Sequence, residues 1–237
     1  MSYAIWTPRA VGSEAHPTRL APWRAVEAQH VAATRALVEN LAEQEILEAI
    51  LESGKPPLPS AAGRLDYLLY TPFRYTPPLP GSRFRAFEDP GVWYGAEAVR
   101  TSCAELGYWR WRFVRDSRGL TRLDAVPHTL FQARVAGDAV DLRLAPFVRD
   151  RVLWSDPGEY GACQRLARSA RQAGVQMIRY ASVRDPQHCG CVAVLDCGAF
   201  VGGVRQRQTW FLTIDAHHAS WVRAGGARRE RFEFSFA

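Results

Sequence analysis

The sequence predicts an α+β protein with a mixed or antiparallel sheet and few helices. Three observations favour this fold class. A stretch over 22–54 without internal proline is rich in helix formers, a second helical segment runs from a Ser155–Asp156 start signal to Gly174, and the last third consists of short apolar runs. The 237 residues, of which 47% are hydrophobic, are enough for a real core.

The first quarter of the chain is expected to be irregular and then helical. Residues 1–21 show little periodicity, so no regular element is expected there. Apolar residues at helical spacing predict one long helix over 22–54, or two helices with a break near Asn40. Gly54 followed by "KPPLP" predicts the end of this helix. The connector 55–63 is interpreted as a loop packed over the body, in preference to a linker between domains.

The remaining elements follow from alternation, short apolar runs and turn signals. A strand is expected over 64–78, ending at paired prolines, and a helix over 96–108. The alternating "YWRWRFVR" is interpreted as a strand, and "TLFQARVAGDAVDLRL" as a hairpin that turns at Gly137 and Asp138. Further strands are expected at "GVWYGA", "VQMIRYAS", "VAVLD", "QTWFLTID", "SWVRAG" and "RRERFEF".

Charge and cysteine content narrow the function classes. The net charge is +6 and Lys55 is the only lysine, but the arginines are dispersed without a binding motif, so no direct nucleic-acid partner is expected. No run approaches the roughly 18 apolar residues of a membrane helix, and the start lacks the pattern of a secretory signal. Five cysteines, an odd number, are untypical of a secreted disulfide framework. A cytoplasmic protein without a membrane partner is expected.

Metal and nucleotide motifs are not found. In "HCGCVAVLDC", His188, Cys189 and Cys191 are too closely spaced for a zinc knuckle. His217 and His218 are adjacent, so on a strand their side chains point to opposite faces. The chain contains no P-loop, GxGxxG after a strand, GxSxG or HExxH. No metal is expected.

The densest mixture of polar and aromatic residues is "GSRFRAFEDPGVWYGAEAVRTSCAEL", in which Arg83, Tyr94 and Glu105 are spaced eleven residues apart. Glu105 lies off the apolar side of the expected helix, beside small residues, where it could face a cleft. The residues alone leave alternatives open: a solvated glutamate, a core tyrosine and a surface arginine. Ser182 directly follows an apolar strand, which fits either a ligand contact or the closing of a turn.

Four motifs in order, "TPFRY", "GSRFR", "VWYGAEAVRTSCAEL" and "RYASVRDP", resemble the RES-domain family over roughly residues 64–200. Members of that family are bacterial toxins paired with antitoxins of the Xre type. Arg85 stands where the family has asparagine, which leaves open whether Arg83 or Arg85 is functional; the spacing to Tyr94 favours Arg83. The resemblance implies the following site residues: Arg74, Tyr75, Arg83, Tyr94, Glu105 and Ser182.

The family fold is similar to that of ADP-ribosyltransferases such as diphtheria toxin. The resemblance therefore implies a mixed or antiparallel β core with flanking helices over 64–237, preceded by a helical N-terminal extension over 1–63. It also implies an enzyme that consumes NAD as a substrate and needs no metal. Such an enzyme either breaks down NAD, with water or phosphate as acceptor, or transfers ADP-ribose to a protein. The alternative from another class is a non-catalytic module that binds nucleic acid or protein.

The residue types suit NAD cleavage. Glu105 would stabilise the positive charge that builds on the ribose, and Tyr94 would offer an aromatic face to nicotinamide. Arg74 and Arg83 would bind the pyrophosphate. Ser182 would bond the ribose or the nicotinamide amide. An Xre-type antitoxin partner is implied by the family alone.

Overall fold

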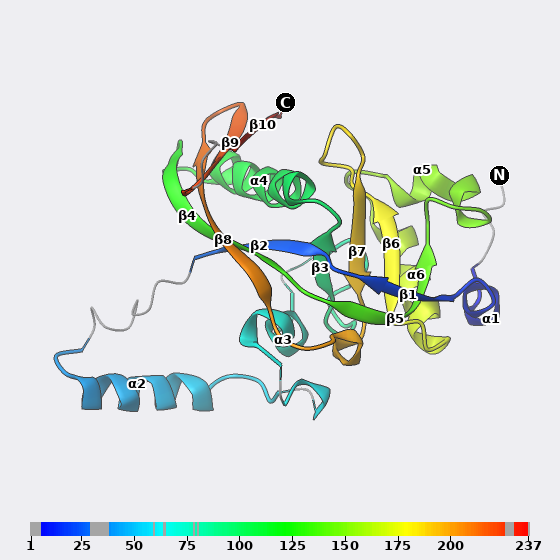
Figure 1. Ribbon diagram of the computed structural model, residues 1–237, viewed down its shortest axis with the longest axis horizontal. Helices are drawn as coiled ribbons and strands as arrows, with labels where there is room; N and C mark the ends of the chain where they lie inside the picture. Colours follow the sequence, from blue (N-terminus) through cyan, green and yellow to red (C-terminus); the bar gives the residue numbers. More distant parts are fainter. Residues whose placement is uncertain are drawn as a thin grey trace.

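The computed structural model describes residues 6–28, 38–58, 60–63, 65–77, 79, 81–225 and 230–236. Its centre is a ten-stranded mixed sheet with the order β1-β5-β6-β7-β3-β2-β4-β8-β9-β10 (Figure 1). Neighbouring strands are antiparallel except the parallel pair β5–β6. The strands are β1 (His16–Leu20), β2 (Trp23–Glu27), β3 (Trp93–Ala96), β4 (Leu123–Gln132), β5 (Val135–Asp141), β6 (Met177–Ala181), β7 (Gly190–Val194), β8 (Arg205–Ile214), β9 (His218–Arg223) and β10 (Arg231–Ser235).

The sheet consists of two five-stranded halves that meet at a single residue pair. β2 pairs with β3 only through Trp23 opposite Ala96, whereas every other pair of neighbouring strands shares at least three residue pairs. Beyond this pair the two strands share no further ladder pairing, so the sheet opens between its halves. This junction, near the middle of Figure 1, is where the cavity described below lies.

Helices cover both faces of the sheet. α4 lies over β2, β4, β8 and β9, and α6 covers β5, β6 and β7 on the same face, while α3 packs on the opposite face. The α+β prediction with flanking helices is confirmed. Within the described residues no helix is both long and apolar enough to cross a membrane. The helices are α1 (Pro8–Gly12), α2 (Leu41–Ser53), α3 (Tyr67–Arg74), α4 (Val99–Asp116), α5 (Arg151–Trp154) and α6 (Gly161–Gln172), with short 3-10 turns η2 (Ser60–Ala62), η3 (Phe147–Asp150) and η4 (Cys197–Ala199).

α4 runs much further than the sequence predicts, because the segment expected to be a strand continues the helix to its end. Cys103, Ala104, Trp111 and Val114 are buried on one side of it, against β8 and β9. These positions recur at helical spacing, so the aromatic and basic residues over 108–115 fit a helix with one buried side as well as they fit a strand. The predicted strand at "YWRWRFVR" is therefore wrong, and the helix begins at Val99, three residues later than predicted.

The helix predicted over 22–54 is wrong in its first part and confirmed in its second. The first part is β2, where Trp23 and Ala25 are buried and their neighbours are more exposed, as on a strand. Residues 29–37 lie outside the described residues. The second part is α2, whose N-terminus is capped by Asn40: its Oδ1 accepts a 2.9 Å hydrogen bond from the backbone N–H of Glu43.

Three further predictions of local structure are wrong, and a fourth is wrong in its start. Residues 1–21 contain α1 and β1, and 64–78 contains the helix α3, capped by Asp66. The hairpin at Gly137 does not exist, because β4 and β5 belong to different halves of the sheet and pair with other strands. The helix expected from Ser155 begins only at Gly161, although its predicted end at Gly174 is confirmed by a left-handed backbone there.

α2 projects away from the sheet, as Figure 1 shows at its lower left. None of its residues is buried. Its C-terminal end is tied to α3 by Arg74, whose Nη1 lies 2.7 Å from a carboxylate oxygen of Glu52 and whose Nε donates to the backbone oxygen of Pro56. The division at residue 63 stays a prediction; what the structure describes is that β1 and β2, which precede it, belong to the same sheet as the later strands.

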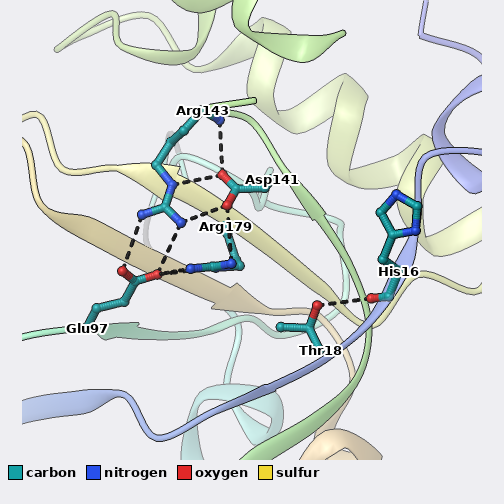
Figure 2. A network of polar contacts seen from close by, with 6 residues as sticks. All are labelled: His16, Thr18, Glu97, Asp141, Arg143 and Arg179. Atoms are coloured by element: carbon teal, nitrogen blue, oxygen red, sulfur yellow. Dashed lines mark hydrogen bonds and ion pairs between the residues drawn. The ribbon is translucent and has the colours of Figure 1, made fainter. Parts of the chain in front are cut away.

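A closed network of four charged side chains lies on β5, β6 and the end of β3 (Figure 2). Arg143 and Arg179 each contact both Glu97 and Asp141, at N–O distances between 2.7 and 3.3 Å. Because Arg179 precedes Tyr180 on β6, the two side chains point to opposite faces of the sheet. The network is therefore on the face away from the cavity.

Gly91 is expected to be essential for stability, since a Cβ at this position would collide with the backbone of α3, 2.6 Å from the oxygen of Pro72. Gly91→Ala should lower the free energy of unfolding by about 1–3 kcal/mol. Urea denaturation measures this. Gly119 has open space around its Cβ position, so Gly119→Ala should stay within about 0.5 kcal/mol of the wild type. Equal values for the two variants would contradict the packing of α3 against this loop.

Candidate active site

A cavity of about 420 Å³ lies at the junction of the two half-sheets. β2 and β3 form its floor, the N-terminal half of α4 and the loop after β6 form one wall, and the turn around Arg83 forms another. Three of its residues are arginines and one is a carboxylate. The lining residues are Arg24, Ala25, Pro77, Gly81, Ser82, Arg83, Tyr94, Gly95, Ala96, Ser102, Glu105, Leu106, Trp109, Tyr160, Tyr180, Val183, Arg184 and Cys191.

Glu105 is the carboxylate of this cavity. It lies two turns into α4, where the helix crosses the open junction of the sheet. Burial raises the pKa of its carboxyl group above the usual value, while the hydrogen bond from Ser182 and the charges of Arg83 and Arg184 oppose that rise. A carboxylate held in this way has few bonds to water, so it can respond strongly to a positive charge that forms beside it.

Ser182 is completely buried and donates a 2.5 Å hydrogen bond to Oε1 of Glu105. Its hydroxyl oxygen accepts from the backbone N–H groups of Arg184 and Asp185, at 3.2 and 2.9 Å. A hydroxyl has one proton and two lone pairs, and both lone pairs are used here. The proton therefore points to Glu105, which fixes one carboxylate oxygen and leaves the other for a ligand.

Arg83 is 8% exposed and lines the cavity from the turn that precedes β3. Its Nη1 donates to the backbone oxygen of Trp154 at 2.8 Å, and its guanidinium lies 4.8 Å from the ring centre of Tyr160. These two contacts orient the planar group and leave further N–H donors for an anion.

Tyr94 holds the turn that carries Arg83. Its hydroxyl accepts from the backbone N–H of Phe84 at 2.9 Å and lies 2.8 Å from the hydroxyl of Ser82. Burial raises the pKa of Tyr94 to about 12, so the phenol stays neutral near pH 7. Its hydroxyl is thus occupied by the protein, and its ring contributes to the cavity wall.

The structure brings Arg83, Tyr94, Glu105 and Ser182 together: the first three line the cavity and the fourth is bonded to Glu105. It does not bring Arg74 there.

Arg74 and Tyr75 lie at a different cleft, of about 640 Å³, together with Arg85. Arg74 is engaged with α2, as described above, and Tyr75 is 38% exposed. Arg85 donates to three backbone oxygens, of Asp89, Pro72 and Tyr75, and so holds its loop to the end of α3. Of the two candidate arginines, only Arg83 lines the cavity.

Arg24 is one of two cavity arginines, with Arg184, that the sequence did not predict as site residues. Its Nη1 donates to the backbone oxygen of Tyr94 at 2.9 Å, and its guanidinium lies 5.4 Å over the ring of Trp93. Its buried Nε has no hydrogen-bond partner among the described residues. Burial lowers the pKa of Arg24 to about 10, which still leaves it charged at neutral pH. The alternation of "WRAVE" is typical of a strand, but the prediction of a helix over 22–54 took precedence over it.

Arg184 crosses the mouth of the cavity. Its Nη2 donates to the backbone oxygen of Pro157 at 2.5 Å and to the hydroxyl of Tyr160 at 3.4 Å. Its guanidinium also lies 3.6 Å from the ring centre of Tyr108 on α4. The loop after β6 and the segment before α6 are thereby connected above the cavity.

The charges of the cavity define what it can hold. Arg24, Arg83 and Arg184 form no ion pair with a carboxylate of the described residues, so the cavity is electropositive around Glu105. Buried positive charge without a partner is costly and favours an anionic ligand. Nowhere in the described ranges do three or more His, Cys, Asp or Glu side chains form a group that could hold a metal ion. The arrangement suits an anionic small molecule that develops positive charge next to a carboxylate.

Comparisons with known proteins identify the family. The family model described as the RES domain matches residues 58–215, and the chain therefore belongs to the RES-domain family. Arg24 precedes the matched segment. No curated protein matches the chain. Among solved structures, the MbcT–MbcA toxin–antitoxin complex of M. tuberculosis is similar, with a TM-score of 0.47 and 12% sequence identity, covering 84% of this chain and 86% of that chain.

Proposed function

We propose that the chain is the toxin of a toxin–antitoxin pair and that it cleaves the nicotinamide–ribose bond of NAD, with water or phosphate as acceptor. The observation that carries the proposal is the buried pair of Glu105 and Ser182, which faces a cavity whose three arginines form no ion pair among the described residues. Membership of the RES-domain family supports it.

Glu105 would act on the charge of the reacting sugar. Departure of nicotinamide builds positive charge on the ribose, and a carboxylate close to the ribose stabilises that charge as it forms. The bond from Ser182 holds the carboxylate in one orientation, so little reorganisation is needed during the reaction. The second carboxylate oxygen is then available for the sugar or for one of its hydroxyl groups.

The arginines would bind the diphosphate. Arg24 and Arg83 come from opposite sides of the junction and present planar donor groups that suit phosphate oxygens. We assign this role to Arg24 in place of Arg74, because Arg74 lies at the other cleft. The rings of Tyr94 and Tyr160 would border the flat nicotinamide.

Transfer of ADP-ribose to a protein is the second candidate. Trp109 at the mouth of the cavity is 44% exposed, and Phe113, one turn along α4, is 55% exposed. Exposed aromatic side chains beside a cavity favour contact with another protein, which fits either a protein acceptor or the Xre-type antitoxin that family membership suggests. Arg184 spans the mouth of the cavity, which favours a small acceptor such as water or phosphate over a protein side chain. We therefore prefer NAD breakdown to transfer.

The purified chain should release nicotinamide from NAD. We expect release measured by chromatography, in buffers with and without phosphate, and no ADP-ribose adduct in the proteome of expressing cells by mass spectrometry. Adducts on one protein with little free ADP-ribose would favour the transferase. Absence of nicotinamide release under all of these conditions, with phosphate and with cell extract as acceptor, would contradict the proposal.

A further inference from the structure

The loop that carries Ser182 is fixed to the first turn of α4 by a buried carboxylate. Asp185 is completely buried, and one of its oxygens pairs with the guanidinium of Arg100. The other accepts a 2.8 Å hydrogen bond from the hydroxyl of Thr101, which is also completely buried. The backbone N–H of Gln187 donates to the carboxylate at 3.1 Å. Side chain and loop are thus held to the same helix that carries Glu105.

Asp185 also contacts Ser182 directly. Its backbone N–H donates to the hydroxyl oxygen of Ser182, and its backbone oxygen accepts from the N–H of His188 at 2.8 Å. The ring of His188 in turn contacts the backbone oxygen of Ser182 at 2.8 Å. Any movement of Asp185 away from α4 would shift one of the two N–H groups that direct the proton of Ser182 toward Glu105.

We propose that Asp185 is a positioning residue for the reaction, which acts through Ser182 on the orientation of Glu105. The reaction that Asp185 would assist rests on the proposed NAD cleavage, whereas the contacts that join Asp185 to Ser182 and Glu105 do not depend on it. Asp185 itself does not line the cavity, so it is not a catalytic residue. Arg100 and Thr101 place the carboxylate of Asp185. The loop transmits that position to the hydroxyl of Ser182, which bonds Glu105 about one turn further along α4.

A purely structural role makes a different prediction. If Asp185 only stabilised the fold, its replacement would lower activity whether or not the hydroxyl of Ser182 is present. If it acts through that hydroxyl, the loss should disappear once the hydroxyl has been removed. The two roles are therefore separated by a double-mutant cycle.

The cycle compares the wild type, Asp185→Asn, Ser182→Ala and the double variant in nicotinamide release. We expect Asp185→Asn to lower kcat by about 10- to 100-fold with little change in the KM for NAD, as misplacement of a reacting group does. In the Ser182→Ala background, the same replacement should change kcat by less than about twofold. Thr101→Val, which removes one bond and keeps the ion pair, should cause a smaller loss in the same direction.

A matched control is available in the network of Figure 2. Asp141 is half-buried and contacts two arginines, but it lies on the face of the sheet away from the cavity. Asp141→Asn should lower the melting temperature and leave kcat unchanged. If Asp185→Asn proves too unstable to purify, Thr101→Val takes its place in the cycle.

The proposal would be overturned if Asp185→Asn, or Thr101→Val in its place, lowered kcat equally with and without the Ser182 hydroxyl. It would also be overturned if Asp185→Asn, or its substitute, left kcat unchanged in the protein that keeps Ser182. If the wild type itself releases no nicotinamide, the proposed NAD cleavage is wrong. The same four proteins are then compared by the growth arrest that they cause in expressing cells. Loss of arrest that depends on Ser182 would still support the positioning role, and loss independent of Ser182 would refute it.

Discussion

Replacing Glu105 by glutamine is expected to lower kcat for nicotinamide release by about 100- to 1,000-fold. Glutamine keeps the size of the side chain, and its oxygen can still accept the bond from Ser182. It lacks the negative charge that would oppose the positive charge on the ribose. The KM for NAD should change much less, because the missing interaction is strongest in the transition state.

The same variant is expected to be at least as stable as the wild type near pH 7. The pKa of Glu105 is raised by burial in the folded state, so the folded chain disfavours the ionised form. For an acid with a raised pKa, ionisation above that pKa lowers the free energy of unfolding relative to low pH. Removing the charge should therefore leave the melting temperature unchanged or raise it, which excludes unfolding as the cause of lost activity.

Glu88 offers a control, because it is an exposed carboxylate outside the cavity. Glu88→Gln should show the kcat of the wild type. A Glu105→Gln variant that is folded and retains full kcat would mean that the charge is supplied elsewhere, and the assignment of Glu105 would be wrong.

Arg24→Gln is expected to raise the KM for NAD by about 10- to 100-fold, the effect of losing one charge-assisted hydrogen bond to a phosphate. The guanidinium of Arg24 is charged and lines the cavity, and its Nε has no hydrogen-bond partner in the described part of the chain. Isothermal titration of NAD into the Glu105→Gln protein, with and without Arg24→Gln, measures binding without turnover. Nicotinamide riboside, which has no phosphate, should bind both proteins equally.

Arg74→Gln is the comparison that decides between the two arginines. Its side chain is engaged with Glu52 and Pro56 at the other cleft, so its loss should leave the KM for NAD within about twofold of the wild type. If Arg74→Gln weakened NAD binding and Arg24→Gln did not, the role that the family resemblance implies for Arg74 would hold, and the cavity would not be the diphosphate site.

The C-terminal half of the fold was readable because its strands are short apolar runs bounded by turns. β6, β7 and the second half of β8 lie on such runs, and alternating burial is seen along the second half of β8. β2 was missed for a physical reason: helix formers such as Ala and Glu surround it, and a strand of five residues has too few alternations to outweigh them. Its strand character comes from pairing with β4, which lies a hundred residues away.

The candidate site was predictable in part. The motif resemblance placed Arg83, Tyr94 and Glu105 in one site, and the structure brings all three to one cavity. Arg24 could not be placed without the sheet, since its approach to the cavity depends on the single pair that joins the halves. Asp185 precedes Pro186, a pair typical of a turn, and no spacing in the sequence reveals its contact with Arg100 on α4.

A crystal structure of the Glu105→Gln protein with NAD tests the central claim most directly. We expect the ribose next to nicotinamide to lie beside residue 105 and the diphosphate to contact Arg24 and Arg83, at the junction of the two half-sheets. NAD bound at the cleft of Arg74 and Arg85, with the junction empty, would contradict the account.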